Sequence, residues 1–316
     1  MQDLLLYYHT VIDMPNKAAN IVTKYGERYA DNLLSGIVFT ALLVTLSTLF
    51  GIPLYWIATS FIVLVHSRHD LSQSAPLALV AMLVTFLVTQ SLIAVIPFIA
   101  LMLAADIYKK YGSIMLSFEL LIVLAMLSVI IIHIFFPDIS SWWLERFAPI
   151  KKLVLNEKTI EPKQVEDVFN GLSRLATGLA AMSAIYSAML GLVIGLLWNA
   201  LIKSSDKIYT ELLNAKMGLI IPIISLFGIA AWLLKYNWMV DIAPIVFGSL
   251  ALYGVYVLLC VSWYLFKKPV WIYIMTILSL FLLMMSDIFK IFIVLLAVTD
   301  YFADWREIFK RVSVDT

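Results

Sequence analysis

Three ionisable side chains, Asp106, Glu119 and His133, lie inside or at the ends of long apolar stretches. Ionisable groups are costly in a lipid bilayer, so they usually face the interior of a helical bundle and mark functional sites. We therefore take these three as candidate substrate-binding residues. The alternative is that they lie at the membrane interface or in structural pairs, and for Glu119 the two interpretations are evenly balanced.

Two further groups of charged residues lie toward the C-terminus. Asp287 and Lys290 are three residues apart, a spacing that places them on one face of a helix as a possible ion pair. A structural pair is favoured because both residues lie at an expected turn. Asp300, Asp304 and Arg306 either form a cytoplasmic site or cap and anchor the last helix, and we favour the second interpretation.

The segment from His66 to Asp70 has two histidines three residues apart beside an aspartate, a set that could ligate zinc. It lies at a membrane border, where solvated polar residues are expected, so we predict no metal site. The sequence has no Walker loop, nucleophile elbow or His-Glu-x-x-His motif. We therefore expect no catalytic residue and no cofactor, and no hydrolysis of ATP through a P-loop.

Long apolar runs must position these groups. Apolar residues make up 63% of the 316 residues and charged residues 14%, against about 45–50% and about 25% in soluble proteins. The runs are Leu34–His66, Pro76–Asp106, Ile114–Phe136, Gly171–Ile202, Met217–Leu234, Ile242–Phe266 and Val270–Asp300. They lack the alternation of a transmembrane barrel, which predicts an all-α, polytopic transmembrane bundle with the lipid bilayer as its main partner.

The net charge of +1 gives no reason to expect nucleic acid, and the single cysteine, Cys260, is expected to be a small core residue.

Three of the runs are longer than one upright membrane span needs and shorter than two spans usually need. Leu34–His66, Pro76–Asp106 and Val270–Asp300 hold 31 to 33 residues, or about 46–50 Å of helix. Each run has a helix-breaking segment near its middle. These segments are Gly51-Ile52-Pro53, Gln90 to Pro97 and Asp287 to Lys290. We favour three hairpins of short helices, which gives ten spans, with eight or nine also compatible. Long tilted helices would give seven.

Charge supports a topology with both termini in the cytoplasm of a bacterium and the chain in its inner membrane. In the ten-span arrangement, 14 of the 22 basic residues lie in inner segments, as the positive-inside rule favours. The predicted organisation is an interfacial segment at 1–32, a first transmembrane group at 33–136, an extramembrane, periplasmic loop at 137–170, a second transmembrane group at 171–303 and a cytoplasmic tail at 304–316. Trp142 and Trp143 are expected to anchor the loop at the interface.

Small residues recur every four positions in the fourth run. They are Ala176, Ala180, Ala184 and Ala188, beside Ser183, Ser187, Gly191 and Gly195. Such residues let helix backbones approach closely in lipid. The stripe either packs inside the bundle, which is favoured, or forms a docking face for another membrane subunit.

The order of these features resembles the YybS-like family of predicted bacterial membrane proteins, a domain of unknown function. The matching stretches are Leu64–His69, Ala104–Glu119 with its Lys109-Lys110 turn, Leu196–Ala200 followed by Tyr209–Lys216, and Val298–Phe309. The resemblance covers residues 34 to 310. The sequence departs from the family at Val298 and Thr299, where a glycine is common, and in its N-terminal extension.

The resemblance implies a likeness to the substrate-binding S-components of energy-coupling-factor transporters, which bind small ligands and dock on a coupling subunit with ATPases. In S-components the docking face lies on an early helix, whereas the small-residue stripe here lies late in the chain. Two functions follow as hypotheses. A protein that binds or transports a small molecule predicts an inward-facing Glu119 among other polar side chains. A scaffold or partner subunit predicts an exposed Ala/Gly groove.

Overall fold

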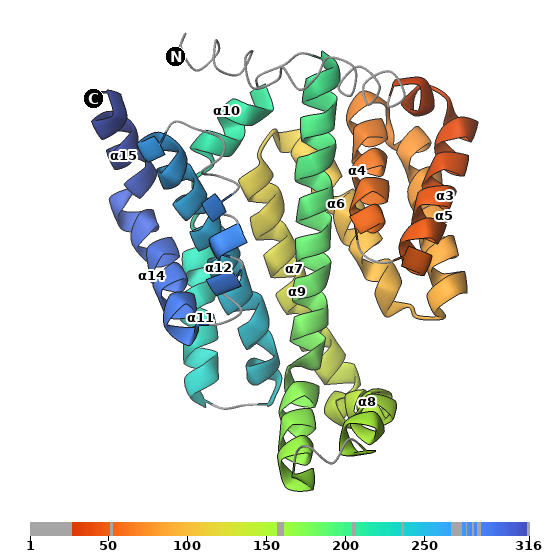
Figure 1. Ribbon diagram of the computed structural model, residues 1–316, viewed down its shortest axis with the longest axis vertical. Coiled ribbons are helices and arrows are strands. Elements are labelled where there is room, and N and C mark those ends of the chain that lie inside the picture. Colours follow the sequence, from red (N-terminus) through yellow and green to blue (C-terminus); the bar gives the residue numbers. More distant parts are fainter. Residues whose placement is uncertain are drawn as a thin grey trace. The chain divides into compact units, whose positions relative to one another are not determined.

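The computed structural model describes residues 27–50, 53–156, 161–203, 207–234, 237–266, 274–275, 277–279, 281–282 and 286–314. Across these residues every regular element is a helix, which confirms the all-α prediction (Figure 1). In this part of the chain, four helical segments are long and apolar enough to cross a bilayer: Leu71–Thr89, Ile114–Phe135, Pro162–Lys203 and Val240–Phe266. The chain is therefore an integral membrane protein with a helical transmembrane region.

The chain divides into two compact units. Unit 1 comprises Met1–Ser117, Tyr186–Ala215 and Phe266–Ile274, and unit 2 comprises Phe118–Ile185, Lys216–Leu265 and Met275–Thr316. Each unit is described by itself.

Unit 1 begins with two helical hairpins. The first pairs α3 (Leu33–Phe50) with α4 (Pro53–Arg68), and the second pairs α5 (Leu71–Thr89) with α6 (Ile96–Tyr111). Proline is tolerated in the first turn of a helix, where its missing N–H is not needed, and α4 begins at Pro53. Gln90 ends α5 in the left-handed region at φ 49°, where its N–H bonds to the carbonyl of Phe86. The breakers thus divide the first two long runs as predicted.

The hairpins pack on one another and on the last third of α9 (Pro162–Lys203). α3 contacts α4 and α5, and α4 contacts α5 and α6. Glycines bring the backbone of α9 against α4, since a Cβ atom at Gly191 would lie 2.7 Å from Thr59 Oγ1 and one at Gly195 would lie 2.6 Å from the carbonyl of Ser60. A short helix, α10 (Lys207–Asn214), follows α9 in the same unit.

Unit 2 holds most of α7 (Ile114–Phe135), α8 (Ile139–Asn156), the first part of α9, α11 (Ile220–Leu234) and most of α12 (Asn237–Phe266). Two C-terminal helices, α14 (Asp287–Ala303) and α15 (Trp305–Val314), complete it. Ser286 caps α14 by accepting a hydrogen bond from the N–H of Phe289. The third long run is therefore broken just before Asp287, close to the predicted turn.

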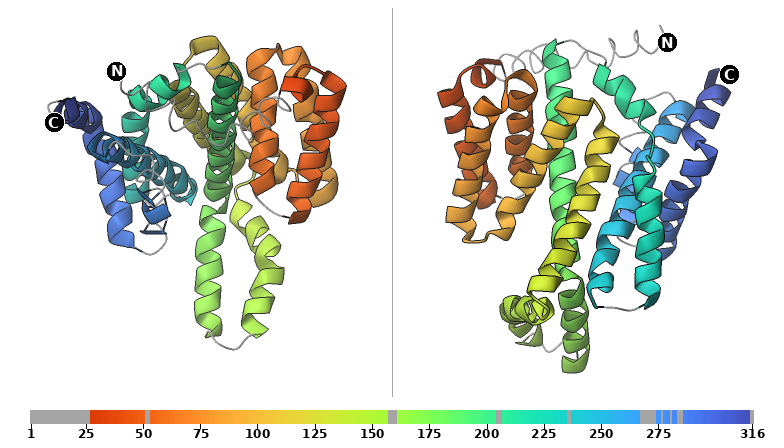
Figure 2. Two further views of the ribbon diagram at one scale, coloured as in Figure 1. Left: turned by 45° about the horizontal axis from the view of Figure 1, so that its top comes forward. Right: turned by 180° about the vertical axis from the view of Figure 1, so that it is seen from behind.

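The segment predicted as an extramembrane loop, 137–170, holds α8 and the first turns of α9. α8 folds back along the first part of α9 (Figure 2). Trp143 Nε1 donates to Thr177 Oγ1 at 3.0 Å, and Lys151 lies 3.6 Å from Glu166. Apolar residues of α8 recur at helical spacing, and its half-buried residues, which include Trp143 and Lys151, lie against α9.

Helix α9 starts at Pro162, nine residues before the predicted run, and has 42 residues. At 1.5 Å per residue it is about 63 Å long, roughly twice the hydrocarbon thickness. Of the predicted interfacial segment 1–32, only Glu27 to Asn32 lies within the described residues. There, Arg68 at the end of α4 lies 3.7 Å from Glu27 and 3.4 Å from Asp31.

Candidate functional site

Glu119 faces inward, as expected, with 4% of the residue exposed. Its carboxylate lies at the start of α11, beside the backbone N–H groups of Gly218 and Ile221, and its Oε1 is buried without a hydrogen-bond partner among the described residues. A Cβ atom at Gly218 would lie 2.5 Å from Glu119 Oε2, so a larger residue there would make the Glu119 carboxylate shift. A negative charge at a helix N-terminus is favourable, and Glu119 therefore holds α11 against α7 through backbone contacts.

His133 lies near the other end of α7, fourteen residues from Glu119 and so about 21 Å along the helix. Its Nε2 lies 3.0 Å from Asp241 Oδ2 on α12. The other oxygen, Oδ1, accepts from the backbone N–H of Gly178 on α9 at 2.7 Å. Asp241 is 1% exposed, so His133 belongs to a closed polar contact that joins three helices of unit 2.

Asp106 lies in unit 1, whereas Glu119 and His133 lie in unit 2. Its Oδ1 is 3.8 Å from Nε2 of His66, and its side chain is 65% exposed. His66 is buried and its Nδ1 lies 2.8 Å from Ser74 Oγ, while His69 lies 3.4 Å from Asp31. The two histidines of the His66–Asp70 segment thus have different partners, and the three candidate substrate-binding residues do not form one site.

The C-terminal residues Asp300 and Arg306 form a buried network in unit 2. Asp300 Oδ2 accepts from the hydroxyl of Tyr253 at 2.8 Å and lies 2.9 Å from Arg306 Nη2. The Tyr253 oxygen also accepts from the N–H of Met217 at 3.1 Å. Arg306 is 5% exposed and lies over the rings of Tyr253 and Tyr256. This network connects α12, α14 and α15 with the segment before α11.

Asp304 extends the network at the corner between α14 and α15, where it adopts the left-handed conformation with φ 48°. It forms an ion pair with Lys216, and its Oδ1 lies 3.9 Å from Arg306 Nη2. Partial burial acts to raise the pKa of Asp304, but the hydrogen bond and charge of Lys216, together with Arg306, lower that pKa below its usual value.

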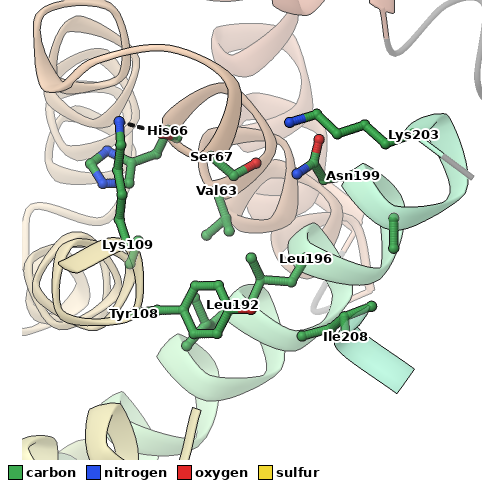
Figure 3. Close-up of a pocket in the computed structure, with 12 residues that line it drawn as sticks. Val63, His66, Ser67, Tyr108, Lys109, Leu192, Leu196, Asn199, Lys203 and Ile208 are labelled. Carbon is green, nitrogen blue, oxygen red and sulfur yellow. Dashed lines mark hydrogen bonds between the residues drawn. The ribbon is translucent and has the colours of Figure 1, made fainter. Parts of the chain in front are cut away.

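A cavity of about 270 Å³ opens in unit 1 where α4, α6 and α9 end (Figure 3). Its lining residues are Val63, His66 and Ser67 from α4, Ala105, Tyr108 and Lys109 from α6, Leu192, Leu196, Asn199, Ala200 and Lys203 from α9, and Ile208 from α10. Lys109 Nζ donates to the carbonyl of His69 at 2.7 Å, and the hydroxyl of Tyr108 donates to Glu211 at 3.0 Å. Asn199 Oδ1 is buried without a hydrogen-bond partner among the described residues. A cavity that combines apolar walls with a few polar groups is typical of a small-molecule site.

Most of the small-residue stripe is buried inside the two units. Ala176, Ala184, Ala188, Gly191 and Gly195 are buried, Ala180 and Ser187 are half-buried, and Ser183 is exposed. This burial favours packing within the chain over an exposed docking groove. The other predicted pair, Asp287 with Lys290, falls outside the described residues, because the placement of the Asp287 side chain is not described.

Sequence reasoning missed Asp241, Gly178 and the cavity. Asp241 was placed just outside its apolar run, although an aspartate bounded by Val240 and Ile242 is itself a signal of an intramembrane ionisable residue. Gly178 lies on the same helix as the predicted stripe but one position away from it in register. The lining residues of the cavity come from four distant segments, and no local pattern predicts that they meet.

No protein-family model matches this chain, and no curated protein or solved structure matches it. The described helices and their contacts therefore carry the functional argument.

Proposed function

We propose that this chain is a multi-pass membrane protein that binds a small molecule in the cavity of unit 1. The observation that carries the proposal is the cavity itself, which combines apolar side chains with Asn199, Tyr108 and two lysines at the ends of three helices. Its volume of about 270 Å³ is near the lower limit for ligand pockets, about 300 Å³, and suits a small metabolite. The chain is an integral membrane protein, and uptake or transfer of that ligand is the role we assign to it.

The resemblance to the YybS-like family supports the same class of function, because its S-component relatives bind small ligands in helical bundles. We place the chain in a bacterial inner membrane with ten spans and with both termini in the cytoplasm. In this orientation the cavity opens on the cytoplasmic side. Neither catalysis nor a bound cofactor is part of the proposal.

The alternative is a scaffold that docks another membrane subunit through the small-residue face. It is less well supported, since five of the eight stripe residues are buried within the chain. Purification of the tagged protein from its native membrane in mild detergent separates the two functions. Recovery of a coupling subunit with ATPases supports the transport role, whereas recovery of unrelated membrane machinery without a small molecule supports the scaffold.

The direct test of the proposed binding site is to fill the cavity with a larger side chain. Ala200 lines it and is 7% exposed, whereas the next residue, Leu201, is 40% exposed. We expect a small molecule to copurify with the wild type and with Leu201→Phe, and to be lost from Ala200→Phe, in mass spectrometry of extracts from the purified proteins. Equal recovery from all three proteins would contradict the cavity as the binding site, and circular dichroism checks that both variants are folded.

A further inference from the structure

Resting on the proposed function, we infer that the ligand of the unit 1 cavity carries an anionic group, a phosphate or a carboxylate, joined to a short apolar portion. The inference follows from the charge of the lining, the placement of its polar groups and the apolar character of its walls.

The two charged residues of the lining are both cations, and one of them, Lys109, lies within ion-pair distance of Asp70 outside the lining. Lys109 and Lys203 are the charged members of the lining, and none of the twelve residues is acidic. Glu211 accepts from the hydroxyl of Tyr108 and from the N–H of Ile114 at 2.7 Å, so both of its oxygens are turned toward these donors and it does not line the cavity. Lys203 is exposed and Lys109 is partly exposed, so an anion near either ammonium group is attracted by a Coulomb energy that water reduces.

The two lysines have different roles. Lys109 Nζ donates to the carbonyls of His66 and His69, near the C-terminus of α4, where the helix dipole is negative. It also lies 3.5 Å from Asp70. Part of its charge therefore stabilises the end of α4. For Lys203, at the end of α9, no carboxylate lies within ion-pair distance among the described residues, and we assign it the main contact with the anion.

Polar and apolar side chains both line the cavity, which suits an amphipathic ligand. In Figure 3, Lys203 and Asn199 lie together across the cavity from Lys109. The side chains of Val63, Leu196 and Ile208 form apolar walls. The buried amide of Asn199 has an oxygen without a partner in the described part of the chain, so it fits a hydroxyl or amine donor beside the anionic group.

A soluble metabolite and the headgroup of a short lipid share this chemistry. The probes are therefore phenyl phosphate, benzyl alcohol and benzylamine, which have the same ring and differ in charge. A fourth probe, a short-chain phosphatidic acid, tests the lipid source. Binding is measured by calorimetry on the full chain in nanodiscs of phosphatidylcholine.

We expect phenyl phosphate to bind the wild type at least about tenfold more tightly than the alcohol or the amine, because a charge-assisted contact is the stronger one. Lys203→Gln should weaken the binding of phenyl phosphate about tenfold. The matched control is Lys110→Gln, since Lys110 lies over the ring of Tyr111 and does not line the cavity. Tighter binding of the phosphatidic acid would assign the anion to a lipid, and weaker binding would assign it to a soluble ligand.

Ala200→Phe separates failure of this inference from failure of the proposed function. If the alcohol or the amine binds as tightly as the phosphate and Ala200→Phe abolishes that binding, the cavity is a binding site and the anion inference is overturned. If no probe binds, or if Ala200→Phe leaves all binding unchanged, both are overturned. If Lys203→Gln binds phenyl phosphate as well as Lys110→Gln does, the assignment to Lys203 is wrong.

Discussion

Buried carboxylates in the described part of this chain are held by groups from other helices. Glu119 lies beside backbone N–H groups at the start of α11, Asp241 contacts His133 and Gly178, and Asp300 contacts Tyr253 and Arg306. A buried charge needs such partners because its desolvation is costly. The ionisable residues that the sequence offers as substrate ligands therefore join helices, and the proposed ligand site uses lysines and an amide instead.

The contact between Gly178 and Asp241 gives a prediction at this scale. A Cβ atom at Gly178 would lie 1.7 Å from the backbone oxygen of Asp241, so Gly178→Ala forces α9 and α12 apart. We expect a loss of about 3 kcal/mol in stability, read as a lower thermal unfolding temperature in detergent. The control is Gly171→Ala on the same helix, where nothing lies within 4 Å of the added atom. That variant should be neutral or more stable by up to about 1 kcal/mol, and equal losses in both variants would refute the close approach.

Residue types in the sequence predict that Glu119 is buried, and the structure agrees. They do not predict its partner, because Gly218 and Ile221 are about a hundred residues away and contribute backbone groups, which every residue has. His133 was likewise recognised as a candidate, while Asp241, the residue that fixes its role, lay at the edge of a predicted run.

At the scale of elements, the corner between α14 and α15 depends on charge. The folded-state pKa of Asp304 is lowered by Lys216 and Arg306 despite partial burial, whereas an unfolded aspartate has a pKa of about 3.9. The pair therefore stabilises the fold fully above about pH 4, and this stabilisation is lost as the pH falls through the folded-state pKa.

Asp304→Asn tests this corner, because asparagine also tolerates the left-handed conformation. We expect the variant to unfold at a lower temperature than the wild type between pH 5 and pH 8, and this difference should shrink as the pH falls below about 4. Thermal unfolding at several pH values measures it. Glu145→Gln on the exposed face of α8 is the control. A difference that stays constant down to the lowest pH would contradict a contribution from the charge of Asp304.

Helix-breaking residues in the sequence predicted where helices end in the first two long apolar runs. Gly51 to Pro53 and Gln90 to Pro97 divide their runs into hairpins because proline and a left-handed residue end helices whatever surrounds them. The sequence predicts 137–170 only as an extramembrane segment between two apolar groups, and it gives no bounds for the helix α8 within it. Its helical structure depends on tertiary contacts such as Trp143 with Thr177, which charge balance does not show.

At the scale of the whole molecule, the proposed topology is the property to test. Cys260 is the single cysteine and is buried, so Cys260→Ser gives a background for single-cysteine labelling. Cysteines placed at Lys110 and Arg311 should react with an impermeant maleimide only after cell lysis, and one placed at Glu161 should react in intact cells. Reaction of the Arg311 position in intact cells would favour the seven-span arrangement.

Composition and run length were sufficient to predict a helical membrane protein, because lipid exposure imposes apolar surfaces along whole helices. The ligand cavity was not predictable in the same way. It depends on the side-by-side placement of residues near 63, 108, 199 and 208, and the packing that achieves this uses glycines whose partners are distant in sequence.

The hydrogen bond from the N–H of Ile114 to Glu211 has a consequence for synthesis of the chain. The two residues are 97 positions apart, so at about 5 to 20 residues per second a ribosome needs roughly 5 to 20 seconds to make the second after the first. During that interval α7 enters the bilayer with its first turn held by Ser113, which accepts from the N–H of Leu116. The lasting connection of α6, α7 and α10 is therefore a late event of biogenesis, completed only after α9 has left the ribosome.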